Sequence, residues 1–315
     1  MTVPPTTQIA FATDQAGIGP CALAIDTALR ATTGKVAVHL LHSELDEGTV
    51  TGIKNVVGSY QEAELHLHPM QKTKMQDVAI DHLYITTMTL ARLLLPEILN
   101  GRVIYLDFDT IIRGDLAALA QIDLQGHVAA AVRDFGIVDM RQWALHTPEN
   151  ASAKHKRRAA RAKKRLADTE ARIGKGMTED YFNAGVLLLD CDAISNDPTL
   201  AKQIRDVEAA SKFELMDQDW LNTVLKGRVL LIDPKWNSFW GNPKSGTSRY
   251  TADMQDTYAA SRNDPAIVHF SGRFKPWDFH LSHYYSHRRR WIWRFHWAQL
   301  RFWWRLRKAK GPAKA

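Results

Sequence analysis

The chain has 315 residues, of which 45% are hydrophobic and 24% are charged, and its formal net charge is +7. These proportions are those of an ordinary globular protein, with room for one large domain or two small ones. Its two cysteines, Cys21 and Cys191, are too few for a disulfide framework or a cysteine-based metal site. The first residues do not have the pattern of a secretory signal, and no apolar run has the length of a spanning helix, so we expect a cytoplasmic protein.

Short β-rich runs alternate with helical runs through most of the chain. We predict helices at 19–32 and 87–99, and strands at 8–13, 35–41, 102–109, 127–132, 184–190, 228–233 and 266–270. This alternation predicts an α/β fold with a mostly parallel sheet covered on both faces. Such sheets bind ligands at the carboxyl ends of their strands, which is where Asp14 and the pair Asp107 and Asp109 fall.

The positive charge is concentrated in two segments. Residues 288–315 hold ten lysines and arginines without an acidic residue, and residues 151–175 hold ten against Asp168 and Glu170. The rest of the chain carries more acidic than basic residues. Residues 148–176 are predicted to form an exposed helix that ends at the glycines 174 and 176. A solvated helix is the default interpretation of this charge run, with an anionic lipid-linked acceptor or a membrane surface as alternatives.

The pair Asp107 and Asp109 follows the apolar run 102–106. Side chains at positions i and i+2 of a strand point to the same side, so these carboxylates are expected to converge on one small volume. Carboxylates suit Mg²⁺ or Mn²⁺, ions that commonly bridge substrate phosphates. By itself, the pattern is equally consistent with acids that cap a turn or the following helix.

Five further stretches place polar residues at strand ends or helix starts. In chain order they are FATDQ with Asp14, TTMTLARL with Arg92, YFNAGVLLLD with Asn183, LMDQDWLN with Asp217 and Gln218, and VHFSGRFKPW with His269, Gly272 and Lys275. Together with the Asp107 pair, these stretches resemble glycosyltransferase family 8, which includes bacterial lipopolysaccharide galactosyl- and glucosyltransferases and glycogenin. The resemblance extends from about Ile9 to Trp277. It implies the GT-A fold, a mixed and mainly parallel sheet flanked by helices.

The resemblance also implies a domain organisation and a chemistry. Residues 1–280 would form the catalytic domain, with a basic helical insertion at about 148–176, and residues 281–315 a membrane-associating segment. Family members depend on Mn²⁺, use UDP-sugars and retain the anomeric configuration. Here the donor would be UDP-galactose or UDP-glucose, with Mg²⁺ as a possible replacement for the metal.

Metal and diphosphate roles are implied for five residues. Asp107 and Asp109 resemble the family's metal ligands, and His269 resembles the third. An imidazole beside carboxylates favours Mn²⁺ over Mg²⁺. Lys275 and the backbone around Gly272 resemble the group that holds the diphosphate, where a positive charge stabilises the leaving UDP.

Other residues resemble those that hold the nucleoside and the sugar. Asp14 corresponds to an acid that contacts the uracil or ribose, although Gln15 and Ala16 replace an asparagine that is frequent in the family. Arg92 and Asp134 resemble residues that bind the sugar hydroxyls, with an ordinary buried ion pair as the alternative. Asn183 and Ala184 resemble a turn close to the sugar.

Asp217 and Gln218 resemble the pair beneath the anomeric carbon. Retention requires either a covalent intermediate on a protein nucleophile or attack on the face from which the leaving group departs. An amide is a poor nucleophile, so Gln218 fits better as a group that stabilises an oxocarbenium-like transition state. Asp217 would bind the sugar or act as the nucleophile, and the sequence leaves both roles open.

The C-terminal stretch 287–315 carries five of the chain's ten tryptophans. On a helix, one face would hold Arg290, Arg294, Arg301, Arg305 and Lys308, and another Trp293, Trp297, Leu300 and Trp304. Adjacent basic and aromatic faces are typical of a helix at an anionic membrane surface. The alternative is a helix that packs its tryptophans against its own domain.

These patterns together predict a retaining, Mn²⁺-dependent hexosyltransferase that acts on a glycan or glycolipid acceptor such as a lipopolysaccharide or lipooligosaccharide core. Its predicted location is the inner face of the cytoplasmic membrane. A self-glycosylating priming protein like glycogenin is one alternative. The pI of about 9.3 suggests another, a nucleic-acid-binding protein. No nucleic acid is expected, because recognition motifs for it are missing from the sequence and the body of the chain is acidic.

Overall fold

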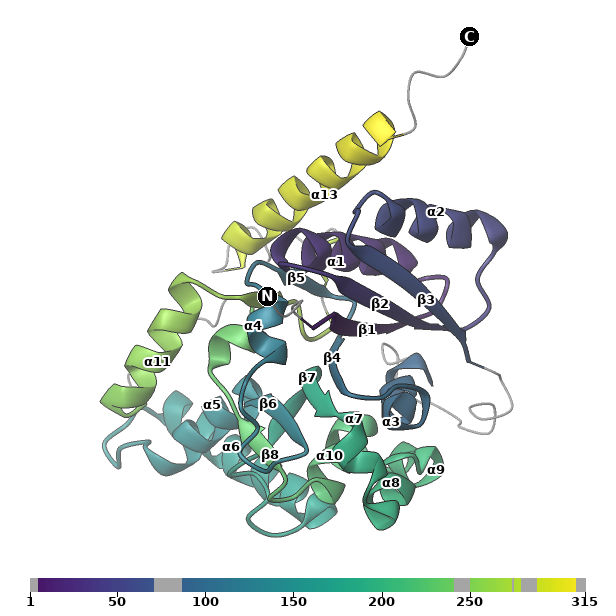
Figure 1. The fold of residues 1–315 in the computed structure, drawn as a ribbon. Coiled ribbons are helices and arrows are strands. Elements are labelled where there is room, and N and C mark those ends of the chain that lie inside the picture. The colour runs from purple at the N-terminus through teal and green to yellow at the C-terminus, as the bar shows by residue number, and fades with distance from the viewer. Residues whose placement is uncertain (1–4, 71–86, 241–249, 274, 279–287, 310–315) are drawn as a thin grey trace.

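The computed structural model describes residues 5–70, 87–240, 250–273, 275–278 and 288–309 (Figure 1). Its largest element is a seven-stranded sheet in the order β3-β2-β1-β4-β7-β6-β8. All neighbouring strands are parallel except β7, which runs antiparallel to both β4 and β6. The strands are β1 (Thr7–Thr13), β2 (Val36–His42), β3 (Ala63–Pro69), β4 (Arg102–Leu106), β6 (Ala129–Arg133), β7 (Phe182–Asp190) and β8 (Val229–Leu231). This architecture confirms the predicted α/β fold.

Helices cover both faces of the sheet (Figure 1). Successive residues of a strand point to opposite sides, so each strand contributes side chains to two cores. Ile9 and Phe11 of β1 contribute to one core with α1 (Ile18–Ala31), α2 (Glu47–Gly58) and α4 (Leu116–Ala120). Ala10 and Ala12 contribute to the other core. That second core is closed by the 3₁₀ helix η2 (Thr87–Leu94) and by α3 (Leu95–Ile98), α7 (Cys191–Ser195), α8 (Pro198–Ile204), α9 (Val207–Ser211) and α10 (Asp217–Val224).

A second, three-stranded sheet lies at the carboxyl end of β4. It consists of β5 (Thr110–Ile112), β10 (Ile267–His269) and β9 (Ser238–Phe239), with β10 in the centre. The chain between β4 and β5 is held at both ends, since Asp107 N–H donates to the Gly185 carbonyl at 2.8 Å and Phe270 N–H donates to the Asp109 carbonyl at 2.9 Å. The acidic pair is therefore fixed in a tight connection between two sheets.

Several boundaries differ from the sequence prediction. The strand predicted at 102–109 ends at Leu106, so Asp107 and Asp109 lie in a turn and not on a strand. The helix predicted at 87–99 is a 3₁₀ helix followed by the short α3, which has Pro96 in its first turn. Proline lacks the N–H that a continuous helix needs and is tolerated where a helix begins. Both α2 and β3 are additional elements that we did not predict.

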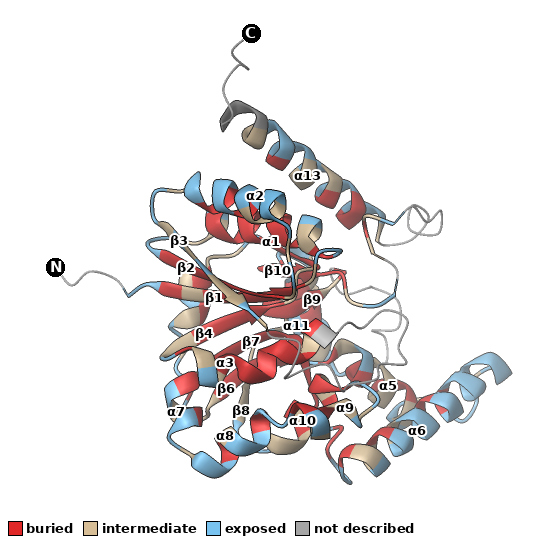
Figure 2. Ribbon diagram, turned by 90° about the vertical axis from the view of Figure 1, so that its right-hand side faces the viewer, coloured by how far each residue is buried: buried red, intermediate tan, exposed pale blue. Residues whose placement is uncertain are grey.

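The basic segment forms α6 (Ala153–Ile173), in agreement with the predicted helix. It begins after Ser152, whose hydroxyl accepts the His155 N–H, and ends at Gly174, which has a positive φ of 114°. A narrow stripe of buried residues, Ala159, Ala162, Thr169 and Ile173, holds it against α5 (Phe135–Leu145) and α10. Most of its residues are exposed, as the pale blue ribbon of α6 shows (Figure 2). The remaining described elements are the 3₁₀ helix η3 (Pro234–Asn237) and the helix α11 (Ala252–Asn263), which contact each other.

The C-terminal helix α13 (Arg289–Ala309) lies across the α1 side of the molecule (Figures 1 and 2). Trp291, Ile292, Phe295 and Phe302 belong to the same buried core as α1. At the other end of the helix, Arg305 pairs with the buried carboxylate of Asp26 and donates to the Tyr60 hydroxyl at 2.6 Å. Within the described residues, no helix combines the length and the apolar character needed to cross a membrane.

Candidate active site

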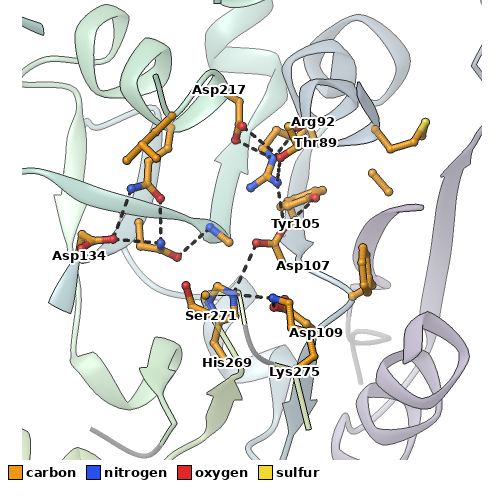
Figure 3. A pocket seen from close by; sticks show the side chains of 18 residues that line it. Thr89, Arg92, Tyr105, Asp107, Asp109, Asp134, Asp217, His269, Ser271 and Lys275 are labelled. Atoms are coloured by element: carbon orange, nitrogen blue, oxygen red, sulfur yellow. Dashed lines mark hydrogen bonds and ion pairs between the residues drawn. The ribbon is translucent and has the colours of Figure 1, made fainter. Parts of the chain in front are cut away.

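A cavity of about 350 Å³ opens at the carboxyl ends of β1 and β4, between the two sheets and α10 (Figure 3). It brings together all of the predicted site residues except Asp14 and Ala184. The predicted residues that line it are Arg92, Asp107, Asp109, Asp134, Asn183, Asp217, Gln218, His269, Gly272 and Lys275. They come from segments up to 183 positions apart in the chain, so the fold and not local sequence assembles them.

Two carboxylates and one imidazole converge on one side of this cavity. His269 Nε2 lies 3.2 Å from Asp109 Oδ1 and 3.6 Å from Asp107 Oδ2. One ligand atom from each residue lies within 4.8 Å of the others. Two carboxylate oxygens and one imidazole nitrogen form a donor set suited to Mn²⁺ and similar divalent ions.

Gly185 provides the space in which this cluster forms. A Cβ atom at this position would lie 2.4 Å from His269 Cε1 and 2.5 Å from Asp107 Oδ2, closer than real contacts allow. Only glycine therefore lets β7 pass so close to the side chains of His269 and Asp107. The donor atoms of these residues thus suit a divalent cation, and the absence of a side chain at Gly185 leaves the space in which they converge.

Lys275 contacts Asp109 on the other side of the same carboxylate (Figure 3). Its ammonium group also donates to the Phe270 carbonyl at 3.2 Å. Burial alone would raise the pKa of the Asp109 carboxyl, but the adjacent Lys275 and His269 outweigh burial and hold this pKa far below its ordinary value. The positive charge beside Asp109 therefore favours its ionised form.

Arg92 is a buried cation between two carboxylates. Its guanidinium lies 2.8 Å from Asp107 and 3.1 Å from Asp217, and it donates to the Ala184 carbonyl. It also stacks over the Tyr105 ring at 4.3 Å. Burial disfavours its charge, but the two carboxylates prevail and raise its pKa above the ordinary value. Arg92 thus forms buried ion pairs, as the alternative interpretation expected, but its partners are Asp107 and Asp217 and not Asp134.

Asp217 begins α10 and is buried. Burial raises the pKa of its carboxyl to about 6, and Arg92 offsets only part of that effect. The residue before it, Met216, has φ 40° and ψ −110°, a strained backbone conformation for a residue other than glycine. The surrounding packing fixes this turn and with it the direction of Asp217 and Gln218.

Gln218 is held by both ends of its amide. Its oxygen accepts from Asn183 Nδ2 at 2.8 Å and from the Ala184 N–H at 3.1 Å. Its nitrogen donates to Asp134 Oδ2 and to the Tyr181 hydroxyl, each at 3.3 Å. Because a backbone N–H is an unambiguous donor, the amide has one orientation, with its oxygen toward β7.

Asp134 lies at the start of α5, where its other carboxylate oxygen accepts the Ile137 N–H at 3.0 Å. It also accepts from Asn183 Nδ2 at 3.2 Å. A carboxylate at a helix N-terminus is stabilised by the unpaired backbone N–H groups there. Asp134 is thus an anchored acceptor on the cavity wall opposite Asp107 (Figure 3).

The two predicted residues outside the cavity have identifiable contacts. Asp14 follows β1 directly, and its carboxylate accepts the Gly17 N–H at 2.9 Å, which closes the turn into α1. Ala184 is buried in β7, where its carbonyl accepts from Arg92 and its N–H donates to Gln218. Ala184 therefore contributes its backbone to the site, but it and Asn183 lie in strand β7 and not in the expected turn.

Sequence reasoning missed several site residues. Tyr105 donates its hydroxyl to Asp107 at 3.0 Å, and Thr89 donates to Asp217 at 3.1 Å. Their spacing gave a usable signal, since Tyr105 precedes Asp107 by two residues and Thr89 precedes Arg92 by three. Asn237, which contacts His269, follows no comparable pattern.

A family model for glycosyl transferase family 8 matches residues 8–280 of the chain. General stress protein A of Bacillus subtilis is 26% identical over 220 residues, which are 68% of this chain and 67% of that protein. The lipopolysaccharide 1,2-glucosyltransferase of Escherichia coli is 27% identical over 177 residues. The lipopolysaccharide 1,3-galactosyltransferase of Salmonella typhimurium is 22% identical over 182 residues. The matched part covers 56% of this chain and 44% of each of these two enzymes.

Solved structures share the fold. The bifunctional glycosyltransferase WbbM superposes with a TM-score of 0.69 at 19% identity, over 94% of this chain and 52% of WbbM, so the chain spans about half of that protein. The galactosyltransferase LgtC, solved with donor and acceptor sugar analogues, superposes with a TM-score of 0.66 at 23% identity, over 93% of this chain and 95% of LgtC. The fold is therefore GT-A, and the chain belongs to glycosyltransferase family 8.

Proposed function

We propose that the protein is a retaining hexosyltransferase that uses Mn²⁺ and a UDP-sugar, galactose or glucose being the transferred sugar. The observation that carries the proposal is the convergence of Asp107, Asp109 and His269 beside Lys275 in one cavity with Asp217 and Gln218. The acceptor we propose is the glycan of a lipopolysaccharide or lipooligosaccharide core. Two relatives that are named as lipopolysaccharide glycosyltransferases support this choice.

Asp107, Asp109 and His269 would hold the metal, which supplies positive charge to the diphosphate of the donor. Lys275 supplies a second positive charge next to Asp109. As the bond between sugar and UDP breaks, negative charge develops on the diphosphate, and a fixed cation beside it stabilises the transition state. The backbone at Gly272, with a positive φ of 101°, lets the chain turn closely around this end of the cavity.

The opposite wall of the cavity offers groups for a sugar. Asp134 accepts hydrogen bonds, and Asn183 both donates and accepts, so together they match the hydroxyls of a hexose. Arg92 lies between the Asp107 and Asp217 carboxylates and fixes both of them. Galactose and glucose differ in the direction of one hydroxyl, which an anchored acceptor such as Asp134 is suited to distinguish.

In this mechanism the amide of Gln218 acts as a fixed dipole. Its oxygen is oriented by Asn183 and the Ala184 N–H, so its partial negative charge stabilises an oxocarbenium-like transition state without moving. Asp217 is committed to Arg92 and Thr89 and is buried, which disfavours a role as nucleophile. Attack on the face from which UDP leaves is therefore the mechanism we favour, with a diphosphate oxygen accepting the acceptor's proton.

The C-terminal helix supports a location on an anionic membrane surface. Trp291 is 2% exposed and belongs to the buried core, whereas Trp297 is 63% exposed, and Trp293, Leu300 and Trp304 face solvent with it. Of the predicted basic residues, Arg305 is engaged by Asp26, and the side chain of Lys308 lies outside the described residues. The exposed aromatic face with Arg294 and Arg301 beside it is what an interfacial helix requires.

A panel of UDP-sugars with Mn²⁺ tests the proposal. UDP release is measured without acceptor and with truncated lipopolysaccharide cores, and the anomeric configuration of the product is read by NMR. We expect acceptor-stimulated release from UDP-galactose or UDP-glucose with retention, and loss of most turnover in Gln218→Ala, which still binds UDP. Gln203→Ala on α8 is the surface control. No release from any donor, or an inverted product, would overturn the proposal.

A further inference from the structure

Asn237 joins the metal-ligand cluster to the sugar side of the cavity without lining the cavity itself. It ends η3 and is 2% exposed. Its amide oxygen lies 2.9 Å from His269 Nδ1, and its amide nitrogen donates to Asn183 Oδ1 at 2.8 Å. Nothing in the chemistry proposed above requires an amide at this position, so its double contact calls for an explanation of its own.

A chain of hydrogen bonds that starts at the backbone determines the direction of this amide. The Gly185 N–H can only donate, and it donates to Asn183 Oδ1 at 3.0 Å. Asn183 Oδ1 is therefore an acceptor, and the atom of Asn237 that faces it must be the NH₂ group. The oxygen of Asn237 then faces His269, so Nδ1 of that imidazole must carry the proton.

The protonation of Nδ1 decides what His269 offers to the carboxylates. A neutral imidazole has one protonated and one unprotonated nitrogen. With the proton on Nδ1, the lone pair of Nε2 points toward Asp107 and Asp109. With the proton on Nε2, the same ring would present an N–H to these carboxylates and could not bind a cation. The carboxylates themselves favour that second tautomer, so an acceptor behind the ring is needed to oppose them.

We propose that Asn237 is a positioning residue that holds His269 in the Nδ1–H tautomer and so makes Nε2 a metal ligand. An acceptor behind a ligand imidazole commonly orients the ring and fixes its tautomer. Because the same amide also anchors Asn183, the arrangement ties the imidazole of the metal cluster to the wall on which Gln218 and Asp134 are fixed. The role in metal binding rests on the proposed function, whereas the role in tautomer selection does not.

The first test reads the tautomer in metal-free protein. Nitrogen-15 NMR of the imidazole side chains is recorded at a pH well above the ordinary histidine pKa of about 6.5, and His269→Gln identifies the resonances among the 13 histidines. We expect wild-type protein to show a protonated Nδ1 and an unprotonated Nε2. Asn237→Ala should lose this pattern and show a protonated Nε2. A wild-type ring with its proton on Nε2, or an unchanged pattern in Asn237→Ala, would overturn the inference.

Metal affinity is the second readout. Mn²⁺ binding with saturating UDP is followed by the electron paramagnetic resonance of the free ion, and Asn237→Ala is expected to bind about 10–100-fold more weakly. Asn237→Asp keeps an acceptor for Nδ1–H but offers no donor to Asn183 Oδ1. It should keep the tautomer and most of the metal affinity while turnover falls.

Asn222→Ala is the matched control for a merely structural effect. Asn222, in α10, is also a buried amide; its oxygen accepts the Phe182 N–H and its nitrogen donates to the Phe182 carbonyl. We expect it to lower the melting temperature as Asn237→Ala does, but to leave Mn²⁺ affinity near that of wild type. Equal losses of affinity in the two variants would overturn the inference. If wild type binds no Mn²⁺ at all, the proposed metal fails, and the NMR measurement still decides the role of Asn237.

Discussion

The ammonium group of Lys275 rests against the Asp109 carboxylate, while His269 Nε2 approaches the same carboxylate from 3.2 Å on its other side. A lysine in this place has two consequences. It keeps Asp109 charged, and it adds a cation to a cluster that is proposed to bind another cation. Lys275 thus weakens the binding of the metal ion alone. Once a diphosphate brings negative charge to both cations, Lys275 favours the binding of the metal.

Lys275→Met is expected to separate these two effects. Mn²⁺ alone should bind as tightly as in wild type or more tightly, because a competing positive charge is gone. Affinity for UDP in the presence of Mn²⁺ and turnover should each fall, with turnover reduced about a hundredfold. Calorimetry with Mn²⁺ and then with UDP measures both. Lys212→Met on the surface is the control, and weaker binding of Mn²⁺ alone would contradict this interpretation of the Lys275 contact.

Gly185→Ala should damage the site through packing alone. The new Cβ would meet His269 and Asp107 within 2.5 Å, so both ligands must move. We expect a loss of about 1–3 kcal/mol in the free energy of unfolding and a loss of Mn²⁺-dependent UDP binding. Gly52→Ala in the exposed part of α2 meets no atom within 4 Å, and it should be neutral or stabilising by up to about 1 kcal/mol. Similar behaviour of the two variants would show that space at Gly185 is not critical.

Asp217 gives the stability of the metal-free protein a specific pH dependence. Its pKa rises from 3.8 to about 6 on folding, so the folded state holds a proton that the unfolded state releases between these values. This contribution to stability is complete below pH 3.8 and is lost as the pH rises through about 6. It amounts to about 3 kcal/mol.

Urea unfolding of wild type and Asp217→Asn at several pH values measures this effect. The stability of wild type relative to the variant should fall between pH 4 and pH 7, because the amide of the variant does not titrate. A relative stability that stays constant or rises with pH would show that the ion pair with Arg92, and not burial, determines the pKa of the Asp217 carboxyl.

Replacing Trp293, Trp297 and Trp304 together by serine should weaken membrane binding. These side chains face solvent on α13, so the melting temperature should change little. Losing about 3 kcal/mol of apolar burial corresponds to a hundredfold weaker partition into vesicles of phosphatidylglycerol and phosphatidylethanolamine. Vesicle sedimentation measures this partition, with Leu145→Ser on α5 as an exposed apolar control. Equal binding by wild type and the triple variant would remove the proposed membrane role of this face.

The sequence allowed much of this fold and site to be predicted, for identifiable reasons. Apolar runs such as 184–190 are buried on both faces, so they read clearly as central strands. Asp107, Asp109 and His269 were found because each belongs to a short motif of the family. The edge strand β3 was missed, although its alternation of leucines with polar residues is typical of a half-exposed strand.

The missing part of the site depends on contacts between distant segments. Asn237 lies in a four-residue 3₁₀ helix, where no periodicity marks a buried side. Its contact to Asn183 spans 54 positions and its contact to His269 spans 32. The pairing of Arg92 with Asp107 and Asp217, and not with Asp134, likewise follows from how η2 packs against α10 and places Arg92 over the Tyr105 ring. Such pairings are properties of the tertiary structure.

The most direct test of the central claim is the dependence of UDP binding on metal. Isothermal titration of UDP into wild type, with Mn²⁺ and with EDTA, is compared with Asp107→Asn and Asp109→Asn, and circular dichroism verifies that each variant is folded. We expect tight binding only in wild type with Mn²⁺, and loss of the metal-dependent part in both variants. Equal affinity for UDP with Mn²⁺ and with EDTA, or unchanged binding in folded Asp109→Asn, would contradict the claim that these carboxylates hold a metal against the diphosphate.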